Sequence, residues 1–168
     1  FKVVAAENLD KTRYDDDEEN WYYADGSGNI YAGEFKTIKG KKYAFQKDGR
    51  MVSGLKFINL DTFDVCGDDK DGMEFDTEDG FMEHAPEYVN REYNLYYFGN
   101  SSDGAMKTGW QRISVWDDAE DDDMDYWFFF QTNGKRFAKL STTGSEYRTK
   151  KVNGKTYAFD ERGVMVSE

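Results

Sequence analysis

The sequence predicts an all-β protein whose β-hairpins stack into a solenoid, with long acidic insertions between some strands. A pattern of alternating aromatic residues, a polar turn and a glycine recurs at residues 22–28, 43–49, 96–104, 128–134 and 157–163. Period-two alternation around a glycine-containing turn is typical of β-hairpins. Each copy is about 20 residues long without its insertion, which is the scale of a structural repeat. The pattern leaves a closed barrel or a sandwich open as alternatives.

Each copy is expected to contain three short strands. A lead-in strand precedes the aromatic strand, at residues 1–4, 35–38, 55–58, 110–113 and 147–149. A third strand is expected after the turn glycine, at residues 30–33, 51–54, 106–109 and 165–167, with a degenerate equivalent at 136–139. The tight turns Lys39-Gly40 and Asn153-Gly154 join lead-in and aromatic strands in copies two and five, where glycine supplies a positive φ.

The whole chain is therefore interpreted as a single repeat module. The predicted copies are 1–33, 35–54, 55–109, 110–139 and 147–168, with an insert at 59–94. Acidic runs lie in the segments 5–20, 59–94 and 114–126, which are expected to be solvated loops because densely clustered like charges repel.

The net charge of −12 argues against nucleic acid as a partner, since phosphate binding needs a basic surface. The same field favours cationic ligands. Calcium loops of the EF-hand type fail at Gly72 and Gly80, because the required acidic ligands are not at the right spacing. A looser cation site among residues 117–125 stays open, but the sequence predicts no metal site and no cofactor.

Catalysis has little support in the sequence. The single cysteine, Cys66, and the single histidine, His84, both lie in the long insert, and no nucleophile, metalloprotease or phosphate-loop motif is present. The chain is therefore expected not to be an enzyme. It begins with Phe1 and has no apolar segment typical of a signal peptide or a membrane span, so it is interpreted as a piece of a longer protein.

Several segments carry a family resemblance. The family pattern begins with Gly-Trp, continues with Trp-Tyr-Tyr-Phe and a glycine turn, and ends with Met and Thr-Gly. Its matches here are Gly109-Trp110, Trp21-Tyr22-Tyr23, Tyr96-Tyr97-Phe98, Trp127-Phe128-Phe129-Phe130, Met51–Gly54 and Met106–Gly109. The chain thus resembles the cell-wall-binding, or choline-binding, repeats of secreted bacterial surface proteins. It is similar also to the related repeats of glucan-binding proteins and large clostridial toxins.

The resemblance implies a left-handed solenoid with ligand sites between successive hairpins, each lined by aromatic rings. Carried over position by position, it implies one site at Trp110, Trp127 and Tyr157. A second would lie at Trp21, Tyr22 and Tyr43. Ring faces suit a quaternary ammonium, which cannot donate hydrogen bonds, and they also stack on sugars.

The sequence departs from the family pattern in three kinds of place. Phe35 and Leu55 stand where the first tryptophan is expected, and alanine replaces an aromatic residue at 44 and 158. Lys42, Leu95 and Thr156 replace the central tryptophan. The remaining alternating aromatics are interpreted as core, namely Tyr43, Phe45, Tyr97, Phe98, Tyr157 and Phe159.

The function expected from the resemblance is attachment of a secreted, Gram-positive-type bacterial protein to its cell wall or surface. The partner would be cell-wall polysaccharide or a choline-decorated polymer, and the module would be fused to another domain. The first alternative is a structural spacer or interaction module with degenerate sites. A second alternative is a β-rich glycosidase fragment, which would need two carboxylates within reach of one bond.

Overall fold

The computed structural model describes residues 2–5, 19–67, 82, 85, 93–99, 103–117, 119–139 and 146–167. Apart from the helical residues Met82 and Ala85, the regular structure in these residues is all-β, as the sequence predicts, and its strands form several small antiparallel sheets. None of the sheets in this part of the chain closes on itself. No helix in the described ranges is long and apolar enough to cross a membrane.

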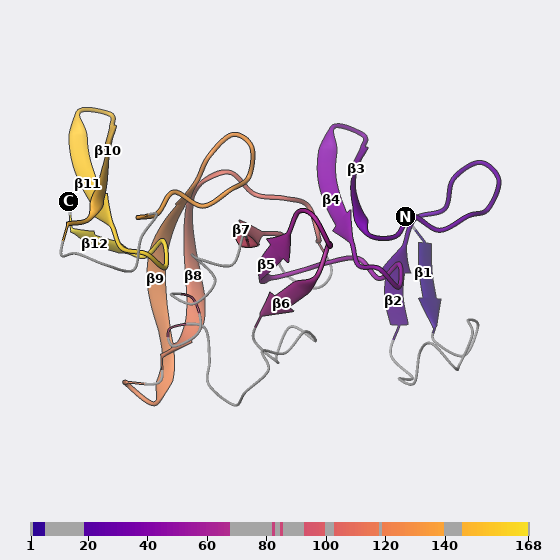
Figure 1. Ribbon diagram of the computed structural model, residues 1–168, viewed down its shortest axis with the longest axis horizontal. Coiled ribbons are helices and arrows are strands. Elements are labelled where there is room, and N and C mark those ends of the chain that lie inside the picture. Colours follow the sequence, from indigo (N-terminus) through magenta and orange to yellow (C-terminus); the bar gives the residue numbers. More distant parts are fainter. Residues whose placement is uncertain are drawn as a thin grey trace.

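The sheets follow one another in chain order along the longest axis of the molecule (Figure 1). At the N-terminal end β1 (Lys2–Ala5) pairs with β2 (Glu19–Tyr22), and β3 (Glu34–Ile38) pairs with β4 (Lys41–Phe45). In the middle β5 (Leu55–Asn59) lies between β6 (Val65–Gly67) and β7 (Tyr93–Tyr97).

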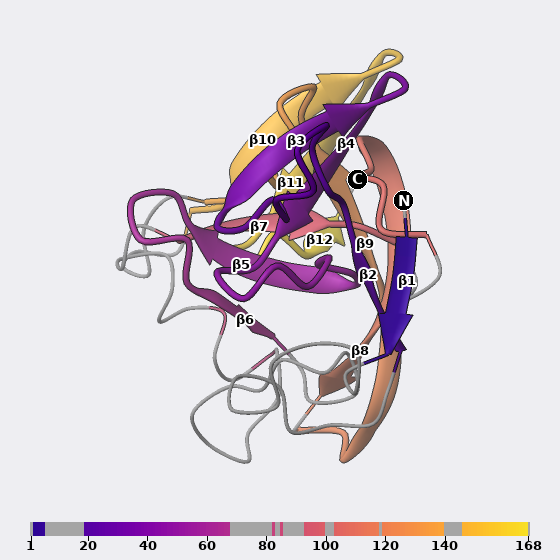
Figure 2. The same cartoon turned by 90° about the vertical axis from the view of Figure 1, so that its right-hand side faces the viewer.

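Two further sheets complete the C-terminal half. The long hairpin of β8 (Gly109–Asp117) and β9 (Asp122–Phe130) is followed by a sheet of β10 (Arg148–Val152), β11 (Lys155–Phe159) and β12 (Met165–Ser167). The β3–β4 and β10–β11 hairpins point to one side of the molecule, and the tip of β8–β9 points to the other (Figures 1 and 2).

The two tight turns have the backbone that the sequence predicts. Lys39 and Gly40 both have positive φ, at 51° and 81°, and so do Asn153 and Gly154, at 50° and 86°. A positive φ at both central residues is the requirement of the type I′ turn, whose twist matches that of the flanking strands. The lead-in strand of the last copy extends further than predicted, because β10 runs on to Val152.

A second kind of turn, after each aromatic strand, is closed by an acidic or amide side chain. In these turns a side-chain oxygen accepts a hydrogen bond from the backbone N–H two residues further on, at Asp25, Asp48, Asp103, Asn133 and Asp160. This local bond stabilises the turn without help from the rest of the fold. The glycine that follows has positive φ in every case, for example 92° at Gly49 and 87° at Gly134.

Turn glycines also mark where consecutive copies touch. A side chain from the preceding copy lies against the α-carbon of the glycine, in the pairs Ile30–Gly49, Met51–Gly104, Met106–Gly134 and Arg136–Gly163. At Gly49, for example, an added β-carbon would lie only 2.7 Å from Ile30 Cγ2. The glycine is therefore needed twice, for its backbone conformation and for this close approach.

The expected third strands are, with one exception, wrong. Only residues 165–167 form a strand, and copies one, two and four show the isolated bridges Ala24–Ile30, Phe45–Met51 and Phe130–Arg136. The reason is that the segment after the turn glycine divides its hydrogen bonds between its own aromatic strand, as from Val52 N–H to the Ala44 carbonyl at 2.8 Å, and the preceding copy. The backbone N–H groups of Met51, Met106 and Arg136 donate to the carbonyls of Trp21, Lys42 and Leu95, at 2.9, 2.8 and 3.0 Å.

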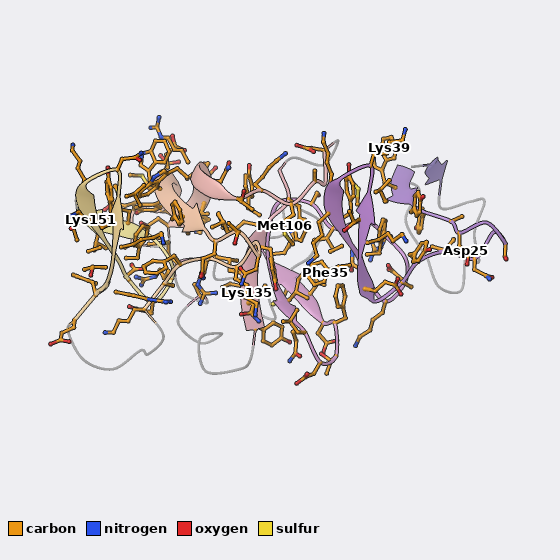
Figure 3. All side chains as sticks on the ribbon, turned by 90° about the horizontal axis from the view of Figure 1, so that it is seen from above. Asp25, Phe35, Lys39, Met106, Lys135 and Lys151 are labelled. Atoms are coloured by element: carbon orange, nitrogen blue, oxygen red, sulfur yellow. The ribbon has the colours of Figure 1, made fainter. Side chains whose placement is uncertain are left out.

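Most of the predicted core aromatics are buried. Phe45, Phe98 and Phe159 have no exposed surface and Tyr43 is nearly buried, whereas Tyr97 and Tyr157 are half-buried. The larger cluster of buried residues joins β5, β7, β8 and β9 and is built around Phe57, Leu95, Phe128 and Phe130. Side chains from successive sheets fill the space between them, as Phe35 and Met106 do around Phe98 (Figure 3).

The prediction that residues 114–126 form a solvated loop is also wrong. In the structure β8 and β9 stay paired as far as Asp117 and Asp122. The reason is that Ile113 and Val115 are buried on one face of this extension, whereas Asp123 and Asp125 lie on the opposite face and are exposed. Asp117, which lies on the buried face, is bonded to Tyr126. Of the expected insert at 59–94, β6 and the first residues of β7 are strands. The expected segment 5–20 falls mostly outside the described residues.

Candidate ligand-binding site

Three residues predicted to form a site lie together in the structure. They are Trp110 on β8, Trp127 on β9 and Tyr157 on β11 of the next sheet, and they are called the tryptophan cluster below. The Trp110 ring centroid lies 4.8 Å from that of Tyr157, with 67° between the ring planes. It lies 6.2 Å from that of Trp127, with 84° between the planes. The cluster thus spans the boundary between two hairpins.

Strand register explains how the cluster forms. Trp110 pairs across the ladder with Phe129, and because side chains alternate along a strand, Trp127 and Phe129 share one face of β9. Trp110 contacts the edge of Phe129 at 5.3 Å and is stacked on Phe159 of β11 at 5.8 Å and 28°. These two additional rings hold the Trp110 indole in place from both hairpins.

Exposure differs within the cluster. Trp127 is 43% exposed, whereas Trp110 and Tyr157 are half-buried. Trp110 is held by packing on several sides, but Trp127 leaves a large part of an indole in water. Large apolar surface that a folded protein leaves exposed often marks a site of interaction.

Charged groups surround the cluster without covering it. Lys150 Nζ lies over Phe129 at 5.2 Å and over Phe137 at 5.4 Å. The Arg112 guanidinium is paired with Asp125, at 3.2 Å between Nη2 and Oδ2. Among the described residues, no cation lies over the rings of the three cluster residues themselves.

The second predicted site is arranged differently. Trp21 is half-buried on β2, Tyr22 is only 2% exposed and Tyr43 on β4 is also buried. Tyr22 occupies the register position of Phe128 and packs toward Gly49, so its ring belongs to the interior. Trp21 and Tyr43 occupy the positions of Trp127 and Tyr157. A binding role for these three residues stays a prediction.

Two features of this region were missed by the sequence reasoning. Phe129 and Phe159 were assigned to no site, although the pairing of Trp110 with Phe129 follows from the hairpin register. Lys42, which stands at the position of Trp127, places its ammonium over the Phe35 ring at 4.7 Å. The only signal for this contact in the sequence was the replacement of an expected tryptophan by lysine.

A strong polar contact closes the far end of the β8–β9 hairpin. The Tyr126 hydroxyl donates a hydrogen bond to the buried Asp117 carboxylate, which also accepts one from the Ala119 N–H at 3.0 Å. The bond from Tyr126 lowers the pKa of Asp117 below its ordinary value of 3.8. The same hydrogen bond, together with burial, raises the pKa of Tyr126 to about 12. This pair fixes the acidic tip as a hairpin rather than a loop.

Residues that would suggest other chemistry do not gather in the described ranges. No group of three histidine, cysteine, aspartate or glutamate residues in these ranges could hold a metal ion. Cys66 is half-buried on β6 beside the larger core cluster. His84 lies outside the described residues.

Comparison with known proteins gives similarities at the level of structure only. No protein-family model matches the chain, and no curated protein matches its sequence. Similar solved structures include choline binding protein F from Streptococcus pneumoniae, at 20% identity, 88% of this chain, 38% of that chain and a TM-score of 0.43. Another is the modular autolysin LytC from the same organism, in complex with a synthetic peptidoglycan ligand. Its sequence identity is 18%, the match covers 98% of this chain and 24% of that chain, and the TM-score is 0.46.

A third similar structure is the multimodular pneumococcal cell wall endolysin from phage Cp-1 complexed with choline. The sequence identity is 19%, the match covers 70% of this chain and 28% of the endolysin chain, and the TM-score is 0.30. The chain thus spans between about a quarter and two fifths of these proteins. The similar structures are choline-binding proteins and cell-wall lytic enzymes of the pneumococcus or its phage. With TM-scores below 0.5, what those proteins bind stays a property of those proteins.

Proposed function

We propose that this chain is a non-catalytic module that binds a choline-bearing polymer or carbohydrate of a bacterial cell surface. The observation that carries the proposal is the tryptophan cluster. It places an exposed indole, Trp127, beside a fixed indole, Trp110, and a tyrosine from the next hairpin. We propose further that the sheets follow one another as a left-handed solenoid, so that such clusters recur between hairpins.

The angles between the rings favour a quaternary ammonium over a sugar. The Trp110 plane is turned by 84° from that of Trp127 and by 67° from that of Tyr157. Rings at such angles direct several faces and edges toward a compact cation, whereas a flat sugar face is best matched by one broad coplanar surface. Each ring face in contact with a cation contributes about 0.5–2 kcal/mol. The net charge of −12 raises the local concentration of cations further.

In this proposal the module attaches a secreted Gram-positive-type bacterial protein to its own or another cell wall. Binding would be weak at each cluster and would gain strength if several clusters engage one polymer. No catalytic step is assigned to this chain, and a catalytic or adhesive activity would belong to a domain fused to it. The similarity in fold to pneumococcal wall-binding proteins is consistent with such a role.

Intrinsic tryptophan fluorescence tests the proposal directly. Choline and glucan oligomers are titrated separately into the intact chain and into the variants Trp127→Ala and Trp116→Phe. Trp116 is a half-buried residue of β8 that does not belong to the tryptophan cluster. We expect saturable quenching by choline, with a midpoint that Trp127→Ala moves to roughly 2- to 30-fold higher choline and that Trp116→Phe leaves unchanged. A response to glucan oligomers alone would identify carbohydrate as the ligand. Absence of any response to either compound would rule out binding at this cluster.

The alternative of a structural spacer is favoured by one observation. Trp110 makes edge or stacked contacts with four other rings, which packing alone could explain. The same titration separates the two, because a spacer would give no response to ligand, whereas Trp127→Ala would then change only stability.

A further inference from the structure

The β3–β4 hairpin contains a counterpart of the tryptophan cluster. Phe35 pairs with Ala44 as Trp110 pairs with Phe129, so Phe35 occupies the position of Trp110. Two residues before the paired position on the second strand stands Lys42, in the place of Trp127. The two hairpins therefore offer the same frame, with one exposed indole replaced by a lysine.

The rings around Phe35 complete the correspondence. Tyr96 of the next described sheet approaches Phe35 at 5.4 Å and 62°, as Tyr157 approaches Trp110. Phe63 approaches Phe35 edge-on at 5.2 Å and 78°. Phe63 and Tyr96 are buried, so the half-buried Phe35 supplies the accessible ring face of this group. The Lys42 ammonium lies over that ring, 4.7 Å from its centroid.

We propose that Lys42 is a built-in occupant of the Phe35 position and prevents it from binding a quaternary ammonium. The inference rests on the proposed function, because it assigns to Lys42 the contact that an external cation would make. The ammonium contacts the ring as a choline headgroup would, but it is tethered by a side chain of four methylene groups. A tethered group competes at an effective concentration of about millimolar or more, and several millimolar would raise the apparent Kd of a ligand of millimolar affinity about fivefold.

At the tryptophan cluster, in contrast to the Phe35 position, the chain's own cation is turned away from the exposed ring. Arg112 lies directly across the ladder from Trp127 and could place its guanidinium on that indole. Instead it is paired with Asp125, which lies two residues before Trp127 on the same face of β9. This cross-strand cation is thus held by a carboxylate, and Trp127 stays 43% exposed. The positions of the chain's own cations determine which of the two ring groups is open.

The test uses tetramethylammonium chloride as the probe and aromatic NMR resonances as the readout. The intact chain is compared with Lys42→Met, which removes the charge but retains a long side chain, and with Lys42→Gln as a second neutral variant. Lys151→Met, which removes an exposed lysine from the β10–β11 hairpin, is the matched control. Trp127→Ala is added to Lys42→Met to isolate the Phe35 position from the tryptophan cluster.

We expect tetramethylammonium to shift the Phe35 and Tyr96 resonances in both neutral Lys42 variants, with an apparent Kd at least about fivefold lower than at the same residues of the intact chain. The shift should persist when Trp127 is replaced, and Lys151→Met should not produce it. Unmoved Phe35 resonances in both neutral variants would overturn the inference, as would equal titration of Phe35 in the intact chain. If tetramethylammonium shifted the Phe35 resonances in the neutral Lys42 variants but left the Trp110 and Trp127 resonances unmoved, the result would refute the proposed function and leave this inference standing.

Discussion

Replacing Trp127 by alanine separates binding from stability more cleanly than any other change in the tryptophan cluster. The indole is 43% exposed and contacts Trp110 at a centroid distance of 6.2 Å, so its removal opens no closed cavity. We expect the free energy of unfolding to fall by about 1 kcal/mol or less, well below the 3–5 kcal/mol typical of a core aromatic.

The effect of Trp127→Ala on binding is expected to be larger in proportion. Loss of one cation–π contact of about 0.5–2 kcal/mol corresponds to an affinity for choline that is weaker by roughly 2- to 30-fold. Isothermal titration with choline measures the affinity, and urea unfolding measures the stability. Trp110→Ala is the contrasting variant, because it removes the ring that four others contact and should lower both. An unchanged affinity in Trp127→Ala, with the fold intact, would refute the reasoning.

Three further predictions follow from the same contacts. Because the pKa of Asp117 is lower in the folded state, its charged form stabilises the fold above pH 4, and this contribution is lost as the pH falls through the folded-state pKa. In Asp117→Asn the free energy of unfolding, measured with urea, should therefore depend less on pH between pH 5 and about 2. Gly134→Ala should cost at least about 2 kcal/mol in thermal unfolding, because Met106 lies against it, whereas Gly28→Ala, with nothing within 4 Å and a similar φ of 86°, should cost about 1 kcal/mol. Asp125→Asn should release Arg112 onto the Trp127 ring and weaken choline affinity about two- to fivefold, and adding Arg112→Gln should restore it.

Much of the fold follows from local rules that the sequence displays directly. The two turns at residues 39–40 and 153–154 need positive φ, which Gly40, Asn153 and Gly154 adopt readily and which Lys39 adopts as well. The meeting of Trp110 and Trp127 also follows from register, because the hairpin turn fixes which side chains share a face. The addition of Tyr157, which lies in the next sheet, was implied by the family resemblance and not by register. Local turn chemistry and alternation were therefore sufficient to predict the hairpins, whereas the candidate site came from the family resemblance.

The errors arise where a non-local partner decides the outcome. Residues 51–54 read as a strand, but the Met51 N–H bonds to Trp21 of the preceding copy, and only a bridge to Phe45 remains. The acidic segment 114–126 was predicted to be a loop because its charge density was given more weight than the apolar alternation of Ile113 and Val115 on β8. Neither effect can be seen in a window of sequence taken alone.

Lys42 illustrates a limit of a different kind. A lysine in place of an expected tryptophan suggests a lost site, since the ring that would bind a ligand is absent. In the structure the lysine does more than remove an aromatic ring, because its ammonium lies over the remaining ring, that of Phe35. Substitution of an aromatic ligand-binding residue by a cation can thus replace an external contact by an internal one, with the same physical interaction. In the proposed arrangement, ligand access to a ring group depends on where each internal cation is paired, and Arg112 is paired with Asp125.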